Sequence, residues 1–129
     1  MKDRIQTVST DQAPAAIGPY SQAKIAGGFL FASGQIAIDP ATGEIDGDDI
    51  RTQTKRVMEN IGKLLAAAGA SYGDVVRTCC FLKDMDDFAA FNEVYGAYFT
   101  DKPARSCVAV KTLPKNVCCE VEVTAYLGD

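Results

Sequence analysis

The strictest constraint on the fold is the alternation of residue types near the C-terminus. Residues 118–126 read Cys-Cys-Glu-Val-Glu-Val-Thr-Ala-Tyr. Successive side chains of a strand point to opposite faces, so Glu120 and Glu122 share one face and Val121 and Val123 share the other. The chain has only two helical segments, and two helices cover one face of such a sheet. The charged face must therefore meet water or another subunit, and a chain this small with an uncovered sheet face often associates.

The first helical segment begins at Ile50. Asp48 or Asp49 is available as its N-cap, and Gly69 suits the position just beyond its C-terminus. Its apolar residues recur at helical spacing, which predicts an amphipathic helix. These residues are Ile50, Val57, Ile61, Leu64, Leu65 and Ala68.

The second helical segment carries an aromatic stripe. The stripe follows Asp84 and Asp86-Asp87 and ends before Pro103. Its residues recur at helical spacing and are Phe88, Phe91, Tyr95 and the pair Tyr98-Phe99. Acidic side chains are favourable at the start of a helix because its dipole is positive there. We expect the stripe to belong to the core.

Strand signals surround these helices. Gly27-Gly28 between residues 22–26 and 29–33 predicts a tight hairpin, after an irregular start through Pro14. Residues 75–82 predict a largely buried strand, and residues 105–110 and 118–126 predict two more. The order strands, helix, strand, helix, strands predicts one α+β domain over residues 1–129. It is a two-layer sandwich in which two helices cover one face of a mixed β-sheet.

Histidine is absent from the 129 residues. This excludes Ser-His-Asp and Cys-His catalytic units, histidine metal ligands and an imidazole pH switch. The formal net charge of −4 makes nucleic acid a poor partner. Five cysteines without a Cys-x-x-Cys spacing fit neither a zinc site nor a secreted disulfide framework, and no apolar run is long enough to span a membrane. We expect a cytoplasmic protein without metal or membrane partner.

The charged residues Arg105 and Glu120 lie on successive predicted strands. If these strands pair as a hairpin, the two side chains come close. One interpretation is a cross-strand ion pair, which contributes only about 0.2–1 kcal/mol. The alternative is a small site in which Arg105 binds a substrate carboxylate and Glu120 handles a proton or a water. The spacing alone favours the ion pair.

Other candidate residues also have ordinary structural interpretations. Cys107 has no histidine to activate it and is more typical of a small buried apolar residue than of a nucleophile. Tyr20 follows Gly18-Pro19 in a polar loop, where an exposed tyrosine is unremarkable. The glycine of Ser33-Gly34 is either a bend at a strand end or a point where a ligand approaches backbone N–H groups.

A set of short motifs occurs together and in order along nearly the whole chain. They are Ile17-Gly18-Pro19-Tyr20-Ser21-Gln22-Ala23, Ser33-Gly34-Gln35-Ile36, Asp39-Pro40-Ala41-Thr42-Gly43, Ala67-Ala68-Gly69, Asp86-Asp87-Phe88, Phe91-Asn92-Glu93-Val94-Tyr95, Pro103-Ala104-Arg105-Ser106, Leu113-Pro114 and Glu120-Val121-Glu122. The chain thus resembles the RidA/YjgF family of reactive intermediate deaminases. The resemblance implies a chorismate mutase-like α+β fold. It also implies a homotrimer with three sites in the clefts between subunits.

The resemblance further implies a 2-iminobutanoate/2-iminopropanoate deaminase. Such an enzyme hydrolyses enamine and imine intermediates, such as 2-aminoacrylate from PLP-dependent dehydratases, to 2-keto acids and ammonia. By motif position, Arg105 would bind the substrate carboxylate bidentately and Glu120 would orient or deprotonate the attacking water. The cleft would be lined by Tyr20, Ser33, Gly34 and Asn92, and Cys107 would contribute mainly backbone contacts. No cofactor is implied, because an imine carbon is already electrophilic.

Two other functions are compatible with the resemblance. A trimer that binds 2-keto acids or similar metabolites without turnover, in a regulatory role, would also use Arg105. The enzyme differs from such a binding protein only in having Glu120 beside a correctly placed water. A ribonuclease or translation-inhibitor function is also ascribed to relatives. The net charge of −4 and the lack of a Lys/Arg cluster count against this function here.

Overall fold

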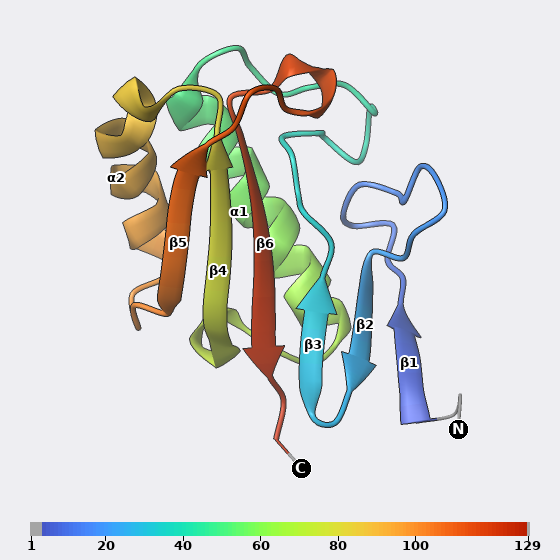
Figure 1. Ribbon diagram of the computed structural model, residues 1–129. Helices are drawn as coiled ribbons and strands as arrows, with labels where there is room; N and C mark the ends of the chain where they lie inside the picture. Colours follow the sequence, from blue (N-terminus) through green and yellow to red (C-terminus); the bar gives the residue numbers. More distant parts are fainter. Residues whose placement is uncertain (1–3, 129) are drawn as a thin grey trace.

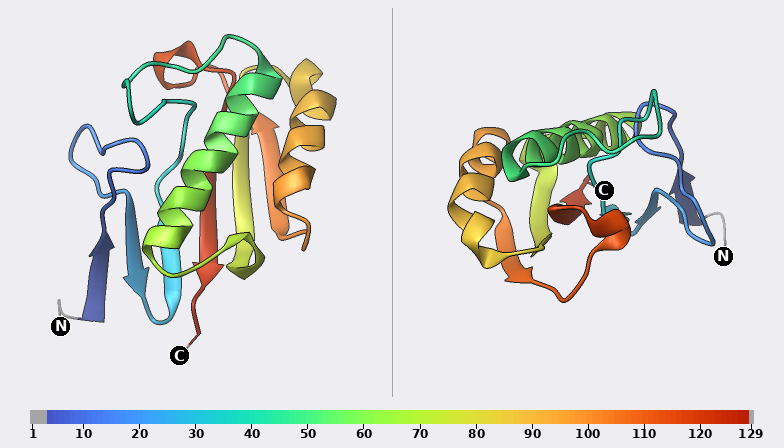
Figure 2. Two further views of the ribbon diagram at one scale, coloured as in Figure 1. Left: turned by 180° about the vertical axis from the view of Figure 1, so that it is seen from behind. Right: turned by 90° about the horizontal axis from the view of Figure 1, so that it is seen from above.

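The computed structural model describes residues 4–128 and has two layers, a mixed sheet and a pair of helices (Figure 1). In chain order the elements are β1 (Ile5–Val8), β2 (Ala23–Ala26), β3 (Phe29–Ala32), α1 (Ile50–Ala67), β4 (Val75–Leu82), α2 (Phe88–Tyr98), β5 (Ala104–Ala109) and β6 (Cys119–Tyr126). The strands lie in the order β1-β2-β3-β6-β4-β5, and β4 and β5 run parallel. Both helices lie on the same side of the sheet (Figure 2). This confirms the predicted α+β sandwich.

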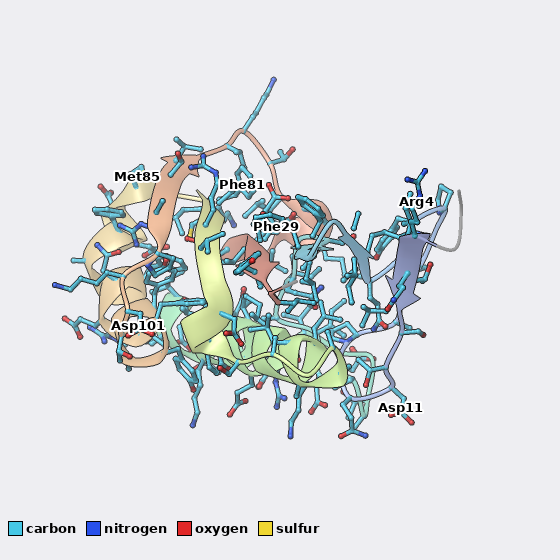
Figure 3. All side chains as sticks on the ribbon, turned by 90° about the horizontal axis from the view of Figure 1, so that it is seen from below. Arg4, Asp11, Phe29, Phe81, Met85 and Asp101 are labelled. Atoms are coloured by element: carbon cyan, nitrogen blue, oxygen red, sulfur yellow. The ribbon has the colours of Figure 1, made fainter. Side chains whose placement is uncertain are left out.

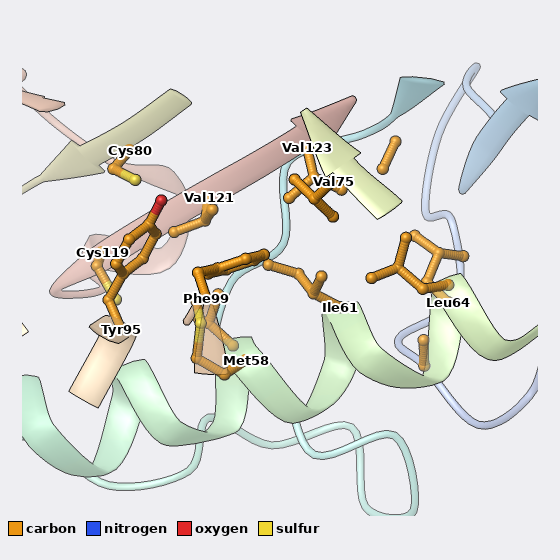
Figure 4. Close-up of a cluster of buried hydrophobic side chains, with 14 of the residues drawn as sticks. Met58, Ile61, Leu64, Val75, Cys80, Tyr95, Phe99, Cys119, Val121 and Val123 are labelled. Atoms are coloured by element: carbon orange, nitrogen blue, oxygen red, sulfur yellow. The ribbon is translucent and has the colours of Figure 1, made fainter. Parts of the chain in front are cut away.

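The alternation in β6 separates the two faces of the sheet as predicted. Val121 and Val123 are buried on the helix side, whereas Glu120 and Glu122 are half-buried on the open side. The core around them includes Met58 and Ile61 from α1 and Phe99 after α2 (Figure 4). Because β6 lies between β3 and β4, its alternation sets the polarity of the whole sheet.

Both helices form where the periodicity predicts them. Asp49 is the N-cap of α1 and accepts a hydrogen bond from the Thr52 backbone N–H at 2.9 Å, and Gly69 has a φ of 75° just beyond the helix. In the aromatic stripe, Phe91, Tyr95 and Phe99 are buried, which confirms its place in the core.

Three expectations about strands were wrong. Residues 5–8 form β1, which pairs with β2, where we expected an irregular start. The strand β4 is only half-buried, because Val76 on its open side is 45% exposed. Finally, β5 and β6 do not form a hairpin, because β4 lies between them and pairs with both. The connection from β5 to β6 crosses over β4 instead.

Three buried side-chain amides hold the irregular segments of the chain. Asn60 of α1 donates to the carbonyls of Ile36 and Ile38 at 3.1 and 2.9 Å. Gln53 of α1 donates to Gly47 O at 3.0 Å and accepts from the Cys118 backbone N–H at 2.8 Å. Gln22 forms hydrogen bonds with backbone groups between residues 10 and 14. Regular structure does not satisfy these backbone groups, so the amides do.

The open face of the sheet carries large apolar side chains. Phe29 and Phe81 lie on the side away from α1 (Figure 3). Phe29 packs against Tyr126 with ring centroids 5.1 Å apart, and Phe31 and Val108 on the same face are each 50% exposed. The helices leave this face uncovered, as the alternation in β6 predicts.

Replacing Asn60 by leucine tests the role of the buried amides. Leucine has a similar volume but no donor, so Asn60→Leu leaves the Ile38 carbonyl without its hydrogen bond. We expect a loss of about 1–3 kcal/mol in the free energy of unfolding, measured by urea denaturation. The control Lys55→Leu, on the exposed side of the same helix, should change it by less than about 0.5 kcal/mol. Equal stability of Asn60→Leu and wild type would contradict the assignment.

Candidate active site

A cavity of about 640 Å³ opens beside the first residues of β6. Residues from segments 14–22 and 33–38, from the loop at 114–115 and from β6 line it. Four of the predicted site residues are among them: Tyr20, Ser33, Gly34 and Glu120. Gln22 binds the Pro14 carbonyl and Asn60 binds the Ile36 and Ile38 carbonyls, so buried side-chain hydrogen bonds hold two of the wall segments. Gln53 binds the Cys118 N–H, just before β6.

A local irregularity brings Gly34 against Glu120. Phe31 pairs with Thr124, and the next pairing joins Gln35 to Val121, so one extra residue is accommodated on the side of Gly34. A Cβ at Gly34 would lie 2.8 Å from the carboxyl carbon of Glu120. Glycine is needed here because the carboxylate occupies the space of a side chain. The close neighbour of Gly34 is therefore the Glu120 side chain, whereas the expected neighbour, if there was one, was a ligand at the backbone N–H groups.

The Glu120 carboxylate is half-buried and unpaired. Within residues 4–128 no Lys or Arg lies within ion-pair distance of it, and it accepts no hydrogen bond. Burial raises the pKa of Glu120, and the nearby negative charge of Glu122 raises it further. A carboxylate that is costly to keep ionised is a stronger base, which suits a group that takes a proton from water.

Tyr20 and Ser33 are held by local hydrogen bonds. The Tyr20 hydroxyl accepts from the Ile17 backbone N–H at 3.3 Å, and its side chain is 52% exposed at the cavity. The Ser33 hydroxyl donates to the Ser21 carbonyl at 2.6 Å. The serine therefore ties β3 to the Tyr20 loop, while the tyrosine presents its ring and hydroxyl hydrogen at the opening.

Arg105 lies in a second place, at the edge of the sheet beside α2. Its guanidinium stacks over the rings of Tyr95 and Phe88, with centroids 4.9 and 5.4 Å away, and donates to Asn92 Oδ1 at 2.7 Å. The Tyr95 hydroxyl is in turn 2.7 Å from Thr78 Oγ1. The aromatic rings and Asn92 fix the plane of the guanidinium, and its remaining N–H groups have no partner among residues 4–128.

The structure does not bring Arg105 and Glu120 together within one chain. Arg105 aligns with Thr78 on the helix side, whereas Glu120 aligns with Phe81 on the open side. Their Cα atoms lie about 14 Å apart, because they are two strands apart in the sheet and three residues apart along the strand direction. Their side chains point to opposite faces. The predicted cross-strand ion pair is therefore wrong, because it required the hairpin that β4 interrupts.

Cys107 lies beside Arg105 on the helix side, with Cys80 as its neighbour across the parallel pair. Burial raises the pKa of the Cys107 thiol, and the charge of Arg105 only partly offsets this. The thiol is therefore protonated at neutral pH, which supports the expectation that it is not a nucleophile.

Sequence reasoning missed four residues of these two places. Phe88 and Tyr95 form the platform for Arg105, and their spacing around Asn92 puts all three on one helix face, a signal that was available. Glu122 and Gln35 line the cavity with Glu120. Glu122 was placed on the right face but not assigned to the site. The contacts of Gln35 depend on the irregularity at Gly34, which no local pattern announces.

Known proteins match almost the full length of this chain. The sequence model of the family described as Endoribonuclease L-PSP matches residues 10–127. A RutC family protein of Pyrococcus horikoshii is 55% identical over 122 residues, which make up 94% of this chain and 97% of that protein. The 2-iminobutanoate/2-iminopropanoate deaminase of Escherichia coli K12 is 44% identical over 124 residues, 93% of this chain and 96% of the enzyme. The chain belongs to the RidA/YjgF family.

Solved structures of RidA/YjgF relatives share the fold. Yeast Mmf1 superimposes with a TM-score of 0.91 at 42% identity, covering 96% of this chain and 99% of that one. Escherichia coli TdcF, solved with bound serine, gives a TM-score of 0.91 at 42% identity and covers 95% and 99%. Among the described residues of this RidA/YjgF protein, none of the helices is long and apolar enough to cross a membrane.

The raised pKa of Glu120 makes a prediction about stability. The native state binds the Glu120 proton more tightly than the unfolded chain does, so the ionised carboxylate destabilises the fold above the raised pKa. Glu120→Gln removes this charge with little change of shape. We expect the variant to have a higher Tm than wild type at pH 8. The difference should shrink as the pH falls through the raised pKa and vanish well below about 4.3, the ordinary glutamate value.

Thermal unfolding between pH 3 and pH 8 measures this difference. Glu44→Gln, which removes an exposed charge outside the cavity, is the matched control and should follow the wild type throughout. A Glu120→Gln variant less stable than wild type at pH 8 would show that the carboxylate has a stabilising partner.

Proposed function

We propose that this protein is a 2-iminobutanoate/2-iminopropanoate deaminase that acts as a cytoplasmic homotrimer. It hydrolyses enamine and imine intermediates to 2-keto acids and ammonia. The observation that carries the proposal is the pair of incomplete half-sites. One is a guanidinium fixed on aromatic rings with donors to spare, and the other is an unpaired carboxylate in a cavity. Deaminases of this name are 44–45% identical to the chain over nearly its full length, and TdcF has been solved with bound serine.

The two half-sites form one site only if two protomers meet. Arg105 and Glu120 lie on opposite faces of one sheet, so a single chain cannot place both on a small substrate. The open face offers the surface for association, because Phe31 and Val108 are each 50% exposed on it. In a closed ring of three protomers, the cavity of each lies against the Arg105 edge of its neighbour. Each cleft then contains one complete site.

Arg105 binds the substrate carboxylate. Its Nη1 donates to Asn92, so the fork of Nε and Nη2 is free to form two parallel N–H···O bonds. Tyr95 and Phe88 prevent the guanidinium from turning away. Cys107, two residues along β5, lines the same edge through its backbone. Fixing the carboxylate in this way fixes the position of the imine carbon next to it.

Glu120 activates the attacking water. The carboxylate accepts a proton from water as its oxygen adds to the imine carbon, and the proton then goes to the nitrogen. As the carbon–nitrogen bond breaks, the hydroxyl group derived from the water loses its proton to Glu120 and becomes the keto oxygen. The bonding electrons leave with the nitrogen as ammonia, which takes up this proton, so the products are a 2-keto acid and ammonium. Overall, a 2-imino acid, one proton and one water give a 2-keto acid and one ammonium ion, so no oxidant or reductant is involved. Tyr20, Ser33 and Gly34 enclose the reacting atoms from the cavity side.

A coupled assay tests the function directly. A PLP-dependent dehydratase acting on serine releases 2-aminoacrylate, and the decay of the enamine and imine is followed optically with and without this protein. Acceleration of pyruvate release is expected. Binding of pyruvate without any acceleration would favour the non-catalytic metabolite-binding alternative instead.

Replacing Arg105 by lysine separates bidentate binding from charge. Lysine keeps the positive charge but presents a single point donor, so it cannot reproduce two parallel hydrogen bonds or the stacking on Tyr95. We expect Arg105→Lys to lower kcat/KM by about 10- to 100-fold in the coupled assay. The control Arg51→Lys, in an exposed pair with Glu93, should leave the activity unchanged. An Arg105→Lys enzyme with wild-type kcat/KM would refute the bidentate role.

A further inference from the structure

The free hydrogen-bonding groups of the cavity are mostly acceptors. Glu120 and Glu122 both line it, and within residues 4–128 neither carboxylate has an ion-pair partner. Gln35 also lines the cavity and is only 5% exposed. Its Nε2 donates to Ser33 O at 3.2 Å, but its Oε1 has no hydrogen-bond partner among the described residues. A buried acceptor without a donor is costly, so these groups favour a ligand that brings N–H donors.

Two of the donors around the cavity are already used, whereas the Tyr20 hydroxyl hydrogen is presented at its opening. The Ser33 hydroxyl donates to Ser21 O, and the Gln35 backbone N–H donates to Val121 O at 2.8 Å. Lys115, at the loop over the opening, is the cation among the lining residues and is exposed. Two carboxylates against one exposed ammonium leave the cavity with a net negative charge. A neutral carbonyl oxygen finds few free donors in such a place.

Glu122 has no structural task that explains its position. It lies on the open side of β6, two residues from Glu120, with Cys79 of β4 opposite. Arg77, the cation of β4 on the same side, donates to Ser106 Oγ at 3.3 Å and does not pair with Glu122. On the other neighbouring strand, Phe31 of β3 is paired with Thr124 and brings no charge. A half-buried, unpaired carboxylate facing a cavity costs stability, so a ligand charge is its natural partner.

We infer that the site binds the protonated, iminium form of its substrate, and that Glu122 is the residue that selects this positive charge. The inference rests on the proposed function and extends it to the charge state of the substrate. The ligand is then a zwitterion, with its carboxylate on Arg105 of one protomer. Its cationic nitrogen faces Glu120, Glu122 and Gln35 of the next.

The selected form is also the reactive one. Water adds to an iminium carbon more readily than to a neutral imine, because the nitrogen that accepts the bonding electron pair already carries a proton. The keto acid product lacks both the charge and the N–H donors, so the cavity that holds the substrate does not hold the product equally well. Differential binding of this kind favours turnover and release.

Calorimetric titration of two ligands with the same carbon skeleton tests the inference. L-alanine carries an ammonium group where the substrate carries its iminium, and pyruvate carries a neutral oxygen there. For the intact assembly we expect Glu122→Gln to weaken alanine binding by about tenfold, as loss of one charge at close range implies, and to leave pyruvate binding unweakened. Retained pyruvate binding also shows that the variant is folded. Glu44→Gln, which removes an exposed charge outside the cavity, should alter neither affinity.

Three results would overturn the inference: equal weakening of both ligands, unchanged alanine binding in Glu122→Gln, or no alanine binding to the wild type. The pH dependence of kcat/KM gives a second test, because a purely structural role of Glu122 would not change it. With Glu122 neutral, one cause of the raised pKa of Glu120 is gone, so the acid limb of kcat/KM should shift to lower pH. If the wild type fails to hydrolyse imines, the proposed function fails, while the alanine and pyruvate affinities still decide the charge preference.

Discussion

The period-two alternation of β6 is the constraint on which the rest of the structure depends. Val121 and Val123 anchor the strand beneath the helices, and this forces Glu120 and Glu122 onto the other face. The same sheet geometry turns Arg105 of β5 toward the helix side, where α2 provides Tyr95 as a platform. One geometrical rule thus buries the core, exposes an apolar and acidic face, and separates the two charged groups of the site. The proposed association and the proposed catalysis both depend on this rule.

Most of the fold could be predicted because its signals are local. The helices at 50–67 and 88–98 follow from apolar spacing, and the hairpin at Gly27-Gly28 from its turn residues. Strand β1 has only four residues, three of them exposed, and gave no comparable signal. The pairing of β4 with both β5 and β6 was out of reach because strand order depends on long-range contacts, whereas the sequence pattern suggested only a hairpin of neighbours.

The sequence named candidate site residues but could not give their arrangement. Motif positions identified Glu120, Gly34 and Tyr20, and the structure gathers these around one cavity. They could not show that the walls are irregular segments held by buried amides, because Asn60 and Gln53 lie in a helix whose pattern reads as ordinary. Such amides fix loops as firmly as strands, which a site needs in order to hold its groups in place. The cost of burying them is offset by the backbone groups they satisfy.

We propose that each site is built from Arg105 of one protomer and Glu120 of the next. Co-expression of Arg105→Ala and Glu120→Gln chains with different tags, followed by purification on both tags, yields only mixed assemblies. In any mixed ring of three, one interface joins an intact Arg105 to an intact Glu120, so the account predicts about one third of the wild-type deaminase rate. Each variant alone should be nearly inactive in the same assay. Mixed assemblies no more active than the single variants would contradict the account.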